Sequence, residues 1–203
     1  MAALRIAVFA SGQGTNFQAI ADAVREGKLD VSIELLVCDK PSAPVIERAR
    51  NAEVEAFVFK PKDYPSREAY ETVILEELRE RKVELIVLAG YMRILTSTLV
   101  EPFEGRMINI HPSLLPSFPG INAIGQAMEH GVKVTGVTVH YVDGGLDSGP
   151  IIAQTAVAIR EDDTEETLAA RIHEAEQELY PRVVGQIAQG LVSVEGRKVT
   201  VSG

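Results

Sequence analysis

Three polar side chains in the second half of the sequence have types that suit acyl transfer to an amine. Asn109 and His111 stand two residues apart in a strand-like stretch, so their side chains project from the same face. An amide and an imidazole on one face can polarise a carbonyl and stabilise the oxyanion that forms when it is attacked. Imidazole also exchanges a proton near neutral pH. The alternative for this pair is a capped strand end with a half-buried histidine.

The third polar side chain belongs to a glycine-rich segment, Asp143–Pro150, which carries two aspartates. A carboxylate near His111 could accept a proton from an incoming ammonium, directly or through water. Turn chemistry also explains Asp and Gly in such a segment, and that explanation fits Asp143 better than Asp147. None of the four histidines in the sequence stands at a metal-ligand spacing, so we expect no protein-bound metal.

A second candidate site is the segment Ser11–Asn16, which follows an apolar strand and begins a helix. Its two glycines allow a ligand to approach the backbone closely, and the N–H groups of a helix N-terminus attract an anion. A dinucleotide-binding fingerprint would need a third glycine where Phe17 stands, and the Gly-Lys-Ser/Thr of a Walker phosphate loop is missing. We therefore predict phosphate binding here, with an ordinary tight turn as the alternative.

Two arginines and the single cysteine also stand at the ends of predicted elements. Arg67 follows Ser66 at the beginning of a helix, where its charge opposes the helix dipole unless an anion binds there. Arg93 follows the apolar strand 85–89, and a solvated side chain explains either arginine equally well. Cys38 ends a strand, and we interpret it as a buried small apolar residue rather than a nucleophile.

The elements that must position these residues alternate between apolar strands and amphipathic helices. In the first half this alternation predicts βαβ units and a parallel sheet covered on both faces. The later part predicts an alternating strand, a long helix with Asp163 as N-cap and Glu166 as its capping-box partner, and a final hairpin. The predicted strands are 4–10, 31–38, 54–59, 85–89, 107–110, 134–142 and 150–159; the helices are 16–26, 43–51, 66–81, 123–130 and 163–189; the hairpin is 192–201. The sequence thus predicts an α/β fold with a mixed sheet.

Composition limits the classes of function. The chain has 203 residues, of which 20 are Lys or Arg and 29 are Asp or Glu, giving a net charge of −9. This length fits one domain, and the charge argues against binding nucleic acid or an anionic membrane surface, although a local pocket for a small anion remains compatible with it. One cysteine excludes an intramolecular disulfide, and we find no signal peptide or apolar run long enough to span a bilayer. We expect a soluble, cytoplasmic protein.

Taken together, these segments make the sequence similar to the phosphoribosylglycinamide formyltransferases, the folate-dependent glycinamide ribonucleotide transformylases of purine biosynthesis. The matching motifs occur in order along the chain: Ser11–Asn16, Ser66–Tyr70, Leu88–Leu95, Ile108–Gly120, Thr138–Ile152 and Glu176–Pro181. The resemblance implies a Rossmann-like formyltransferase fold of the α/β class, with a mostly parallel central sheet, helices on both faces and an antiparallel C-terminal extension. It also implies a single domain over residues 1–203, with a phosphate-binding half of about 1–100 and a catalytic, folate-binding half of about 101–203.

The resemblance further implies that a formyl group passes directly from 10-formyltetrahydrofolate, as co-substrate, to the glycine amine of 5-phosphoribosyl-glycinamide. Asn109, His111 and Asp147 would form a catalytic trio. His111 would donate to the formyl oxygen, Asn109 would hold that oxygen, and Asp147 would tune His111 and relay the proton. His140 would support the trio from behind, and the bond before Pro116 is expected to be cis.

By the same resemblance, the remaining site residues fall into two groups. The ribonucleotide would contact Gly14, Thr15, Asn16 and Glu176. The folate would contact Arg67, Met92, Arg93, Ile94, Leu95, Asn109, Asp143, Gly144, Gly145 and Leu146. Whether Arg67 meets the phosphate or the folate stays open, as does the choice between a monomer and a homodimer. Some members of the family carry histidines after Pro119 and Gly120, where this chain has Asn122 and Ile124.

Three alternatives share part of this pattern. A formyltetrahydrofolate hydrolase uses water and carries a preceding regulatory domain, which we do not expect because strand 4–10 begins close to residue 1. A methionyl-tRNA formyltransferase needs a further C-terminal domain and a basic surface, which fits poorly with 203 residues and a charge of −9. A non-catalytic nucleotide-binding module would not need the trio to converge, so the distance between His111 and Asp147 distinguishes it from an enzyme.

Overall fold

The computed structural model describes residues 2–203, and these residues divide into two compact units. The first unit ends at Ile108, and the second runs from Asn109 to Gly203. The first contains β1 (Leu4–Phe9), α1 (Thr15–Arg25), β2 (Val31–Cys38), α2 (Val45–Asn51), β3 (Ala56–Val58), the 3-10 turn η1 (Pro61–Asp63), α3 (Arg67–Glu80), β4 (Leu85–Leu88) and α4 (Ser97–Val100). Strand β5 (Met107–His111) begins in the first unit and ends in the second, which continues with α5 (Ala123–His130), β6 (Val134–Tyr141), β7 (Ile151–Ala158), α6 (Glu165–Ala188), β8 (Val192–Glu195) and β9 (Lys198–Val201).

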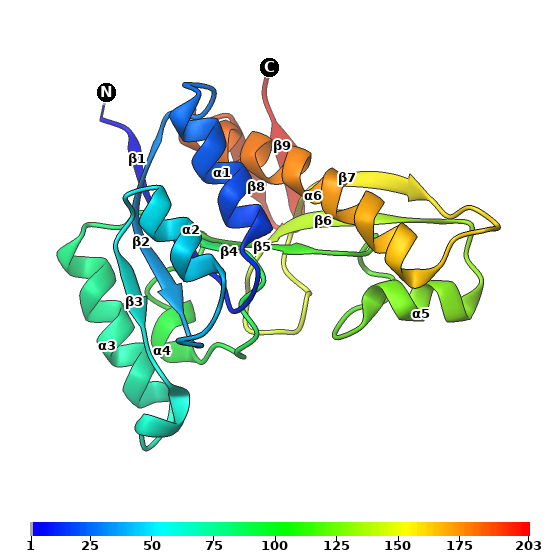
Figure 1. Ribbon diagram of the computed structural model, residues 1–203. Coiled ribbons are helices and arrows are strands. Elements are labelled where there is room, and N and C mark those ends of the chain that lie inside the picture. The colour runs from blue at the N-terminus through cyan, green and yellow to red at the C-terminus, as the bar shows by residue number, and fades with distance from the viewer. Residues whose placement is uncertain (1) are drawn as a thin grey trace. The chain divides into compact units, whose positions relative to one another are not determined.

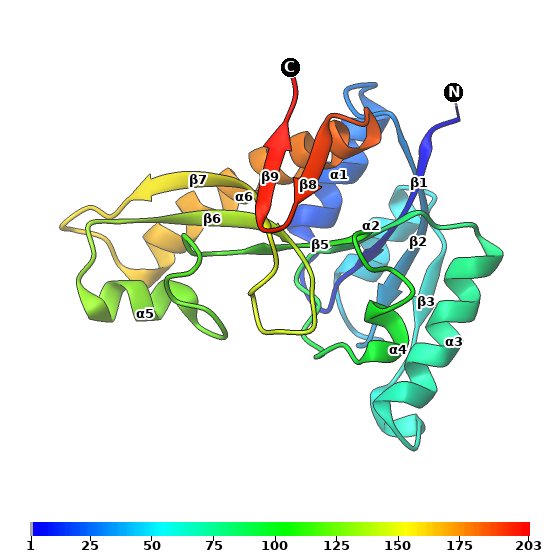
Figure 2. The same cartoon turned by 180° about the vertical axis from the view of Figure 1, so that it is seen from behind.

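Strands β1 to β4 form a parallel sheet in the order β3-β2-β1-β4. Ile6 on β1 pairs with Ile33 on β2 and with Leu85 on β4. Because these strands are nearly continuous apolar runs, both faces of the sheet need a cover. Helices α1 and α2 lie on one face and α3 and α4 on the other (Figure 1 and Figure 2). The predicted βαβ organisation is confirmed for this unit.

The parallel arrangement also decides which loops of the first unit meet. Carboxyl ends of parallel strands lie at one edge of the sheet, so the segments that follow β1, β2 and β4 come together there. The backbone N–H of Ser11, after β1, donates to the carbonyl of Gly90, after β4, at 3.1 Å. The Ser11 hydroxyl donates to Asp39, which follows β2. Two segments predicted to bind substrate, Ser11–Asn16 and Met92–Leu95, therefore begin side by side.

The second unit is built around the antiparallel pair β6 and β7, in which Val134 lies opposite Ala158. Strand β6 is buried over most of its length, whereas β7 alternates between covered and exposed residues. Helix α6 packs against both strands and buries Leu168 and Ile172 there, four residues apart on one helical face (Figure 1). Strands β8 and β9 form a separate antiparallel hairpin, and β9 lies against β7 (Figure 2).

The N-terminus of α6 differs from the prediction. Thr164, not Asp163, is the N-cap, and its hydroxyl accepts the N–H of Thr167 while the Thr167 hydroxyl accepts the N–H of Thr164. The capping-box partner is thus Thr167 and not Glu166. Asp163 instead binds both terminal nitrogens of Arg171, at 2.6 and 2.7 Å, about two turns further along the helix. A guanidinium within reach is a stronger partner for the carboxylate than a helix N–H.

Smaller differences from the predicted elements have simple causes. Strand β3 covers three residues instead of 54–59, because its ladder with β2 includes only the pairs from Ala56 to Val58. Helix α4 and the turn η1 were not predicted, since a single turn is too short to show a helical period. Within residues 2–203, none of the helices combines the length and the apolar character needed to cross a membrane.

Candidate catalytic and substrate-binding site

His111 and Asp147 come together inside the second unit. His111 ends β5, and Asp147 stands in the loop between β6 and β7. Nδ1 of His111 lies 3.6 Å from Oδ2 of Asp147, and the two side chains are only 7% and 10% exposed. This distance is slightly too long for a direct hydrogen bond, but it falls within ion-pair range and within reach of one bridging water. It meets the condition on which the catalytic interpretation depends.

The other ring nitrogen of His111 is already committed. Nε2 lies 2.8 Å from the carbonyl oxygen of Phe118. A carbonyl only accepts hydrogen bonds, so Nε2 carries a hydrogen and Nδ1 is the nitrogen left to exchange a proton with a ligand or with Asp147. The loop that supplies the carbonyl is fastened in place, because the Ser113 hydroxyl donates to the carbonyl of Ser117 at 2.6 Å and the Phe118 ring lies edge-on to His130.

Asp147 is held by the backbone as well as by its neighbours. Its Oδ2 accepts the N–H of Gly120 at 2.7 Å, and its own backbone adopts a left-handed conformation with φ of 49°. Aspartate tolerates that conformation better than most residues, yet such a value needs support from surrounding contacts. Its second oxygen, Oδ1, lies 3.9 Å from Nε2 of His140. One carboxylate therefore faces two imidazoles.

His140, which the resemblance implies as a support for the trio, lies on β6 with Nε2 near Asp147. Its Nδ1 is 2.9 Å from the carbonyl of Tyr141, so that nitrogen carries the hydrogen. Burial lowers the pKa of His140, which favours the neutral ring and leaves Nε2 as an acceptor. Among the described residues, Nε2 is buried and has no hydrogen-bond partner. Two acceptors, His140 Nε2 and Asp147 Oδ1, thus lie 3.9 Å apart, so that one donor beside them could hydrogen-bond to both.

The remaining polar residues near the pair are arranged as follows. Asn109 stands two residues before His111 on β5 and is half-buried, so strand alternation places its side chain on the same face as His111. Asp143 stabilises the turn in which it lies, because the N–H of Gly145 and the hydroxyl of Ser148 both donate to its Oδ1. Although burial acts in the opposite direction, these hydrogen bonds lower the pKa of Asp143. The peptide bond before Pro116 is cis, as the resemblance implies.

The segment Ser11–Asn16 has the geometry expected of an anion site. Gly14 occupies the N-cap position of α1 with φ of 75°, and the helix has no side-chain cap within the described chain. A methyl group on Gly14 would strike the side chain of Val45, so only glycine fits this approach of α2 to the loop. Arg48 on α2 donates to the carbonyl of Gln13 at 2.6 Å, which fixes the loop from the same side. Thr15 and Asn16 are the first residues of α1.

The predicted folate residues of the first unit lie in the loop after β4 and at the beginning of α3. The side chains of Met92 and Ile94 are exposed by 66% and 67%, which is unusual for large apolar residues. Arg93 is exposed by 40%, and its Nε donates to Asp39 at 2.7 Å. Leu95 is half-buried, and Arg67 is the exposed first residue of α3.

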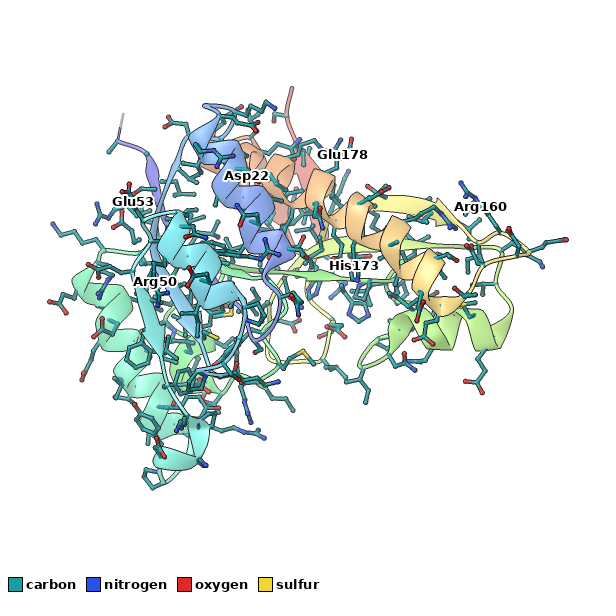
Figure 3. The ribbon with its side chains drawn as sticks, in the orientation of Figure 1. Asp22, Arg50, Glu53, Arg160, His173 and Glu178 are labelled. Atoms are coloured by element: carbon teal, nitrogen blue, oxygen red, sulfur yellow. The ribbon has the colours of Figure 1, made fainter. Side chains whose placement is uncertain are left out.

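The other predicted binding residues belong to the second unit. Leu146 is exposed, as are Gly144 and Gly145 beside it. Glu176 is buried on α6, and Nδ1 of His173, one turn earlier on this helix (Figure 3), lies 3.1 Å from its Oε2. This hydrogen bond raises the pKa of His173. Asn122 is the N-cap residue of α5 with φ of 54°, and Ile124 is half-buried on that helix.

Two further features of the described residues concern positions outside the predicted site. Residues 2–203 contain no group of three or more His, Cys, Asp or Glu that could hold a metal ion. A cavity of about 430 Å³ in the first unit is lined by α1, the beginning of β2 and the residues after α2, including Asp22 and Glu53 (Figure 3). None of the predicted site residues lines it.

Comparison with known proteins identifies the family. The model of the family described as formyl transferase matches residues 4–184. The chain belongs to the formyl transferase family. It is 56% identical over 183 residues to phosphoribosylglycinamide formyltransferase of Bacillus subtilis strain 168, covering 90% of this chain and 94% of that protein. It is also 47% identical over 188 residues to the trifunctional purine biosynthetic protein adenosine-3 of Drosophila pseudoobscura pseudoobscura, covering 92% of this chain and 14% of that protein.

Solved structures give the same result for this formyl transferase. The crystal structure of glycinamide ribonucleotide transformylase 1 from Symbiobacterium toebii superposes with a TM-score of 0.96 and 46% sequence identity, covering 99% of this chain and 95% of that one. The predicted fold class, a Rossmann-like formyltransferase fold with a mixed sheet and an antiparallel C-terminal extension, is confirmed.

Several residues that shape the site of this formyl transferase were not singled out from the sequence. The carbonyl of Phe118 and the N–H of Gly120 are backbone groups, and backbone groups have no residue-type signal. Asp39 and Glu71 are buried acids that bind the loop after β4. Asp39 could have been found, because it directly follows β2 and the carboxyl ends of parallel strands meet at one edge.

Proposed function

We propose that this formyl transferase moves the formyl group of 10-formyltetrahydrofolate to the glycine amine of 5-phosphoribosyl-glycinamide. Its relatives, which include a phosphoribosylglycinamide formyltransferase and a trifunctional purine biosynthetic protein, support formyl transfer in purine biosynthesis. The observation that carries the proposal is the buried pair of His111 and Asp147, in which one nitrogen of His111 is tied to a carbonyl and the other faces the carboxylate.

The proposed reaction forms one C–N bond and breaks another. The amine lone pair attacks the formyl carbon, and the carbonyl electrons move onto the formyl oxygen. When the oxyanion collapses, the bond between the formyl carbon and N10 of the folate breaks. One proton leaves the attacking amine and one proton arrives at N10, so the products are the N-formyl ribonucleotide and tetrahydrofolate. The protein must therefore stabilise an oxyanion and move a proton.

In our proposal the trio divides these tasks. His111, when its ring carries a proton on both nitrogens, donates the Nδ1 proton to the formyl oxygen and takes it back when the oxyanion collapses, since Nε2 is held by Phe118. The amide of Asn109, on the same strand face, donates to the same oxygen, a type of contact worth about a 10²–10³-fold rate effect in other enzymes. Asp147 accepts the proton that leaves the amine. The two neighbouring acceptors, Asp147 Oδ1 and His140 Nε2, support a position for the attacking ammonium or for a proton-carrying water beside them.

We propose the following substrate contacts for the residues outside the trio. The phosphate is bound by the helix end at Gly14, Thr15 and Asn16, and the glycinamide end by Glu176. The folate is bound by Arg67, by Met92, Arg93, Ile94 and Leu95, by Asn109, and by Asp143, Gly144, Gly145 and Leu146. An uncapped helix end next to Gly14 supports the first assignment. Exposed Met92, Ile94 and Leu146 support the second, because a folate ring needs apolar surface to lie on.

The same proposal extends to the domain organisation, the partners and the place of action of the protein. We propose that residues 1–203 act as one formyltransferase domain, an idea supported by a single family match that extends from residue 4 to residue 184. The partners are then these two small molecules, without nucleic acid or membrane, and the place of action is the cytoplasm. The net charge of −9 and the single, buried cysteine are consistent with those assignments.

The decisive experiment follows deformylation of 10-formyltetrahydrofolate by absorbance, with and without 5-phosphoribosyl-glycinamide. We expect turnover that requires the amine substrate. In Asp147→Asn we expect kcat to fall about 10²–10⁴-fold, because an amide keeps an acceptor for the Gly120 N–H but cannot take a proton. The kcat of His111→Ala should fall by a similar factor.

The other outcomes of this experiment name the alternatives. Turnover without the amine would identify a hydrolase and contradict the proposed acceptor. Absence of turnover with either acceptor would favour a binding module. A loss smaller than about tenfold in Asp147→Asn would remove Asp147 from the proton path.

A further inference from the structure

Two buried carboxylates of the first unit have no part in the proposed chemistry. The side chain of Asp39, after β2, is 0% exposed, and Glu71 on α3 is equally covered. Burying an ionised carboxylate is costly unless hydrogen bonds or a counter-charge compensate it, and apolar residues often fill such positions with equal or better stability. Both acids therefore need an explanation other than stability, and both contact the short loop between β4 and α4.

Asp39 holds the beginning of this loop. Its Oδ2 accepts the N–H of Arg93 Nε at 2.7 Å, and its Oδ1 accepts the hydroxyl of Ser11. The same Ser11 oxygen accepts the backbone N–H of Met92 at 2.9 Å. Asp39 thus fixes one side chain directly and one backbone N–H through Ser11. An asparagine could still accept from Arg93 with its carbonyl oxygen, but its NH2 group could not accept the Ser11 hydroxyl, and the negative charge opposite the guanidinium would be lost.

Glu71 holds the end of the loop. Both of its oxygens lie 3.1 Å from the backbone N–H of Thr96, and Oε1 also accepts the Thr96 hydroxyl at 3.0 Å. Thr96 is the N-cap of α4, so this contact sets the point at which the loop gives way to a helix. A glutamine could preserve both bonds through its single carbonyl oxygen, whereas an alanine would remove them and leave the Thr96 donors without their partner.

The residues between these two anchors are those that our proposed function assigns to the folate. Met92 and Ile94 expose most of their apolar side chains to solvent, even though the N–H of Met92 is bonded to Ser11, which in turn binds a buried acid, and the N–H that follows Leu95 is bonded to Glu71 directly. A free loop with such side chains would fold them inward to remove apolar surface from water. Clamping at both ends prevents this and keeps the apolar side chains available.

We propose that Asp39 and Glu71 are positioning residues that hold the Met92–Leu95 segment in its folate-binding conformation before the folate arrives. The inference rests on the proposed function, because it takes the ligand of this segment to be the folate. Neither acid touches the reacting atoms in this proposal. They act by removing the cost of ordering the loop upon binding, which is the general means by which a preformed site gains affinity.

The two acids Asp39 and Glu71, which we call the clamp, predict a specific kinetic signature. Asp39→Asn and Glu71→Ala should each raise the KM for 10-formyltetrahydrofolate by about tenfold or more, while kcat and the KM for the amine substrate change by less than about threefold. Glu71→Gln should recover most of the loss. In the ligand-free protein, hydrogen exchange at the backbone N–H groups of Met92 and Thr96 should accelerate in the first two variants and stay slow in Glu71→Gln.

A control variant separates positioning from general destabilisation. Asp163→Asn removes a carboxylate whose side chain is 3% exposed and which binds a guanidinium, Arg171, as Asp39 binds Arg93. It lies at the beginning of α6 and outside the proposed folate residues. It should lower the free energy of unfolding without changing the KM for the folate or the exchange at Met92.

Each result of this experiment supports or overturns the inference. A raised folate KM with accelerated exchange supports it. Unchanged exchange in Asp39→Asn and Glu71→Ala would show that the clamp does not order the loop, and faster exchange with an unchanged folate KM would show that order there is irrelevant to the folate; either overturns it. No turnover by the unsubstituted protein would overturn the proposed function, and with it the folate role of the clamp, whatever the variants show.

Discussion

At the scale of single residues, the chemistry depends on which atom of each side chain is already engaged. His111 gives Nε2 to the Phe118 carbonyl, so Nδ1 is its only reactive nitrogen. Asp147 gives Oδ2 to the Gly120 N–H and turns Oδ1 toward His140. Because each side chain has one fixed and one available atom, the pair is oriented before any substrate binds, and preorganised polar groups of this kind account for much of enzymatic catalysis.

Cys38 provides a test at the same scale. It is fully buried, and this burial raises the pKa of its thiol. A thiol that is both inaccessible and protonated reacts slowly with electrophiles. We expect the native protein to react with a maleimide at least about 100-fold more slowly than the denatured protein, in which the thiol is free. The reaction is followed by mass spectrometry in buffer and in guanidinium chloride.

Rapid labelling of the native protein would contradict that expectation. It would also reopen the possibility that Cys38 is a reactive group at the carboxyl end of β2, which the sequence interpretation rejected. Retention of full activity after labelling would separate accessibility from function.

At the scale of elements, the anion site depends on how closely α2 approaches the loop that begins α1. The N–H of Val45 donates to the carbonyl of Gly12 at 3.1 Å, and Arg48 donates to that of Gln13. Gly14 lies directly against Val45 with φ of 75°, so it lacks both the space and the backbone conformation for a side chain. Packing of one helix therefore shapes the N-terminus of another.

This contact predicts the effect of Gly14→Ala. We expect a loss of about 2–4 kcal/mol in the free energy of unfolding, from the overlap with Val45 added to the strain of a positive φ. The KM for the ribonucleotide should rise together with that loss, because the first-turn N–H groups move. Urea unfolding and steady-state kinetics measure the two effects.

Gly27→Ala is the matched control for that substitution. Gly27 has φ of 72°, and a methyl group there would meet nothing within 4 Å, so only the backbone strain remains. A cost of about 1 kcal/mol with an unchanged KM is expected. Equal costs in both variants would show that contact with Val45 does not matter.

At the scale of the whole molecule, the net charge of −9 opposes the proposed anionic substrates. Helix ends and backbone N–H groups solve this problem, because they attract an anion at short range without giving the protein a basic surface. Such dipoles act over a few ångströms, whereas the net charge acts over the Debye length. Binding is then local in origin, and long-range steering does not contribute to it.

This balance predicts a weak response to salt. Raising the ionic strength from about 0.02 to 0.2 M should change kcat/KM for the ribonucleotide by less than about threefold, since screening relieves long-range repulsion and leaves the buried contacts intact. A fall of about tenfold or more would indicate that exposed arginines, such as Arg67, attract the substrate over a distance. Stopped-flow or steady-state assays at a series of salt concentrations, all with the same type of salt anion, distinguish local binding from long-range attraction.

The sequence by itself determined the parts of this protein that depend on periodicity and residue type. Apolar strands alternating with amphipathic helices predicted the parallel sheet of the first unit, and the family pattern predicted the fold class and the cis bond before Pro116, all of which are confirmed. It also singled out His111 and Asp147, because an imidazole and a carboxylate beside glycine-rich or proline-rich turns are recognisable in one dimension. Their roles stay predictions.

The tertiary structure alone decided how each of these groups is bonded. Only the structure shows that Arg93 is bonded to Asp39 and Thr96 to Glu71. It also shows that Thr164 is the N-cap of α6 and that His111 is bonded to the carbonyl of Phe118. The reason is physical: a buried polar group takes whatever donor or acceptor the fold brings within about 3 Å, and many of these partners are backbone atoms that every residue has. Sequence patterns indicate which residues are buried and which lie in turns. The hydrogen-bond partner of each polar group is decided only when segments distant in the sequence meet.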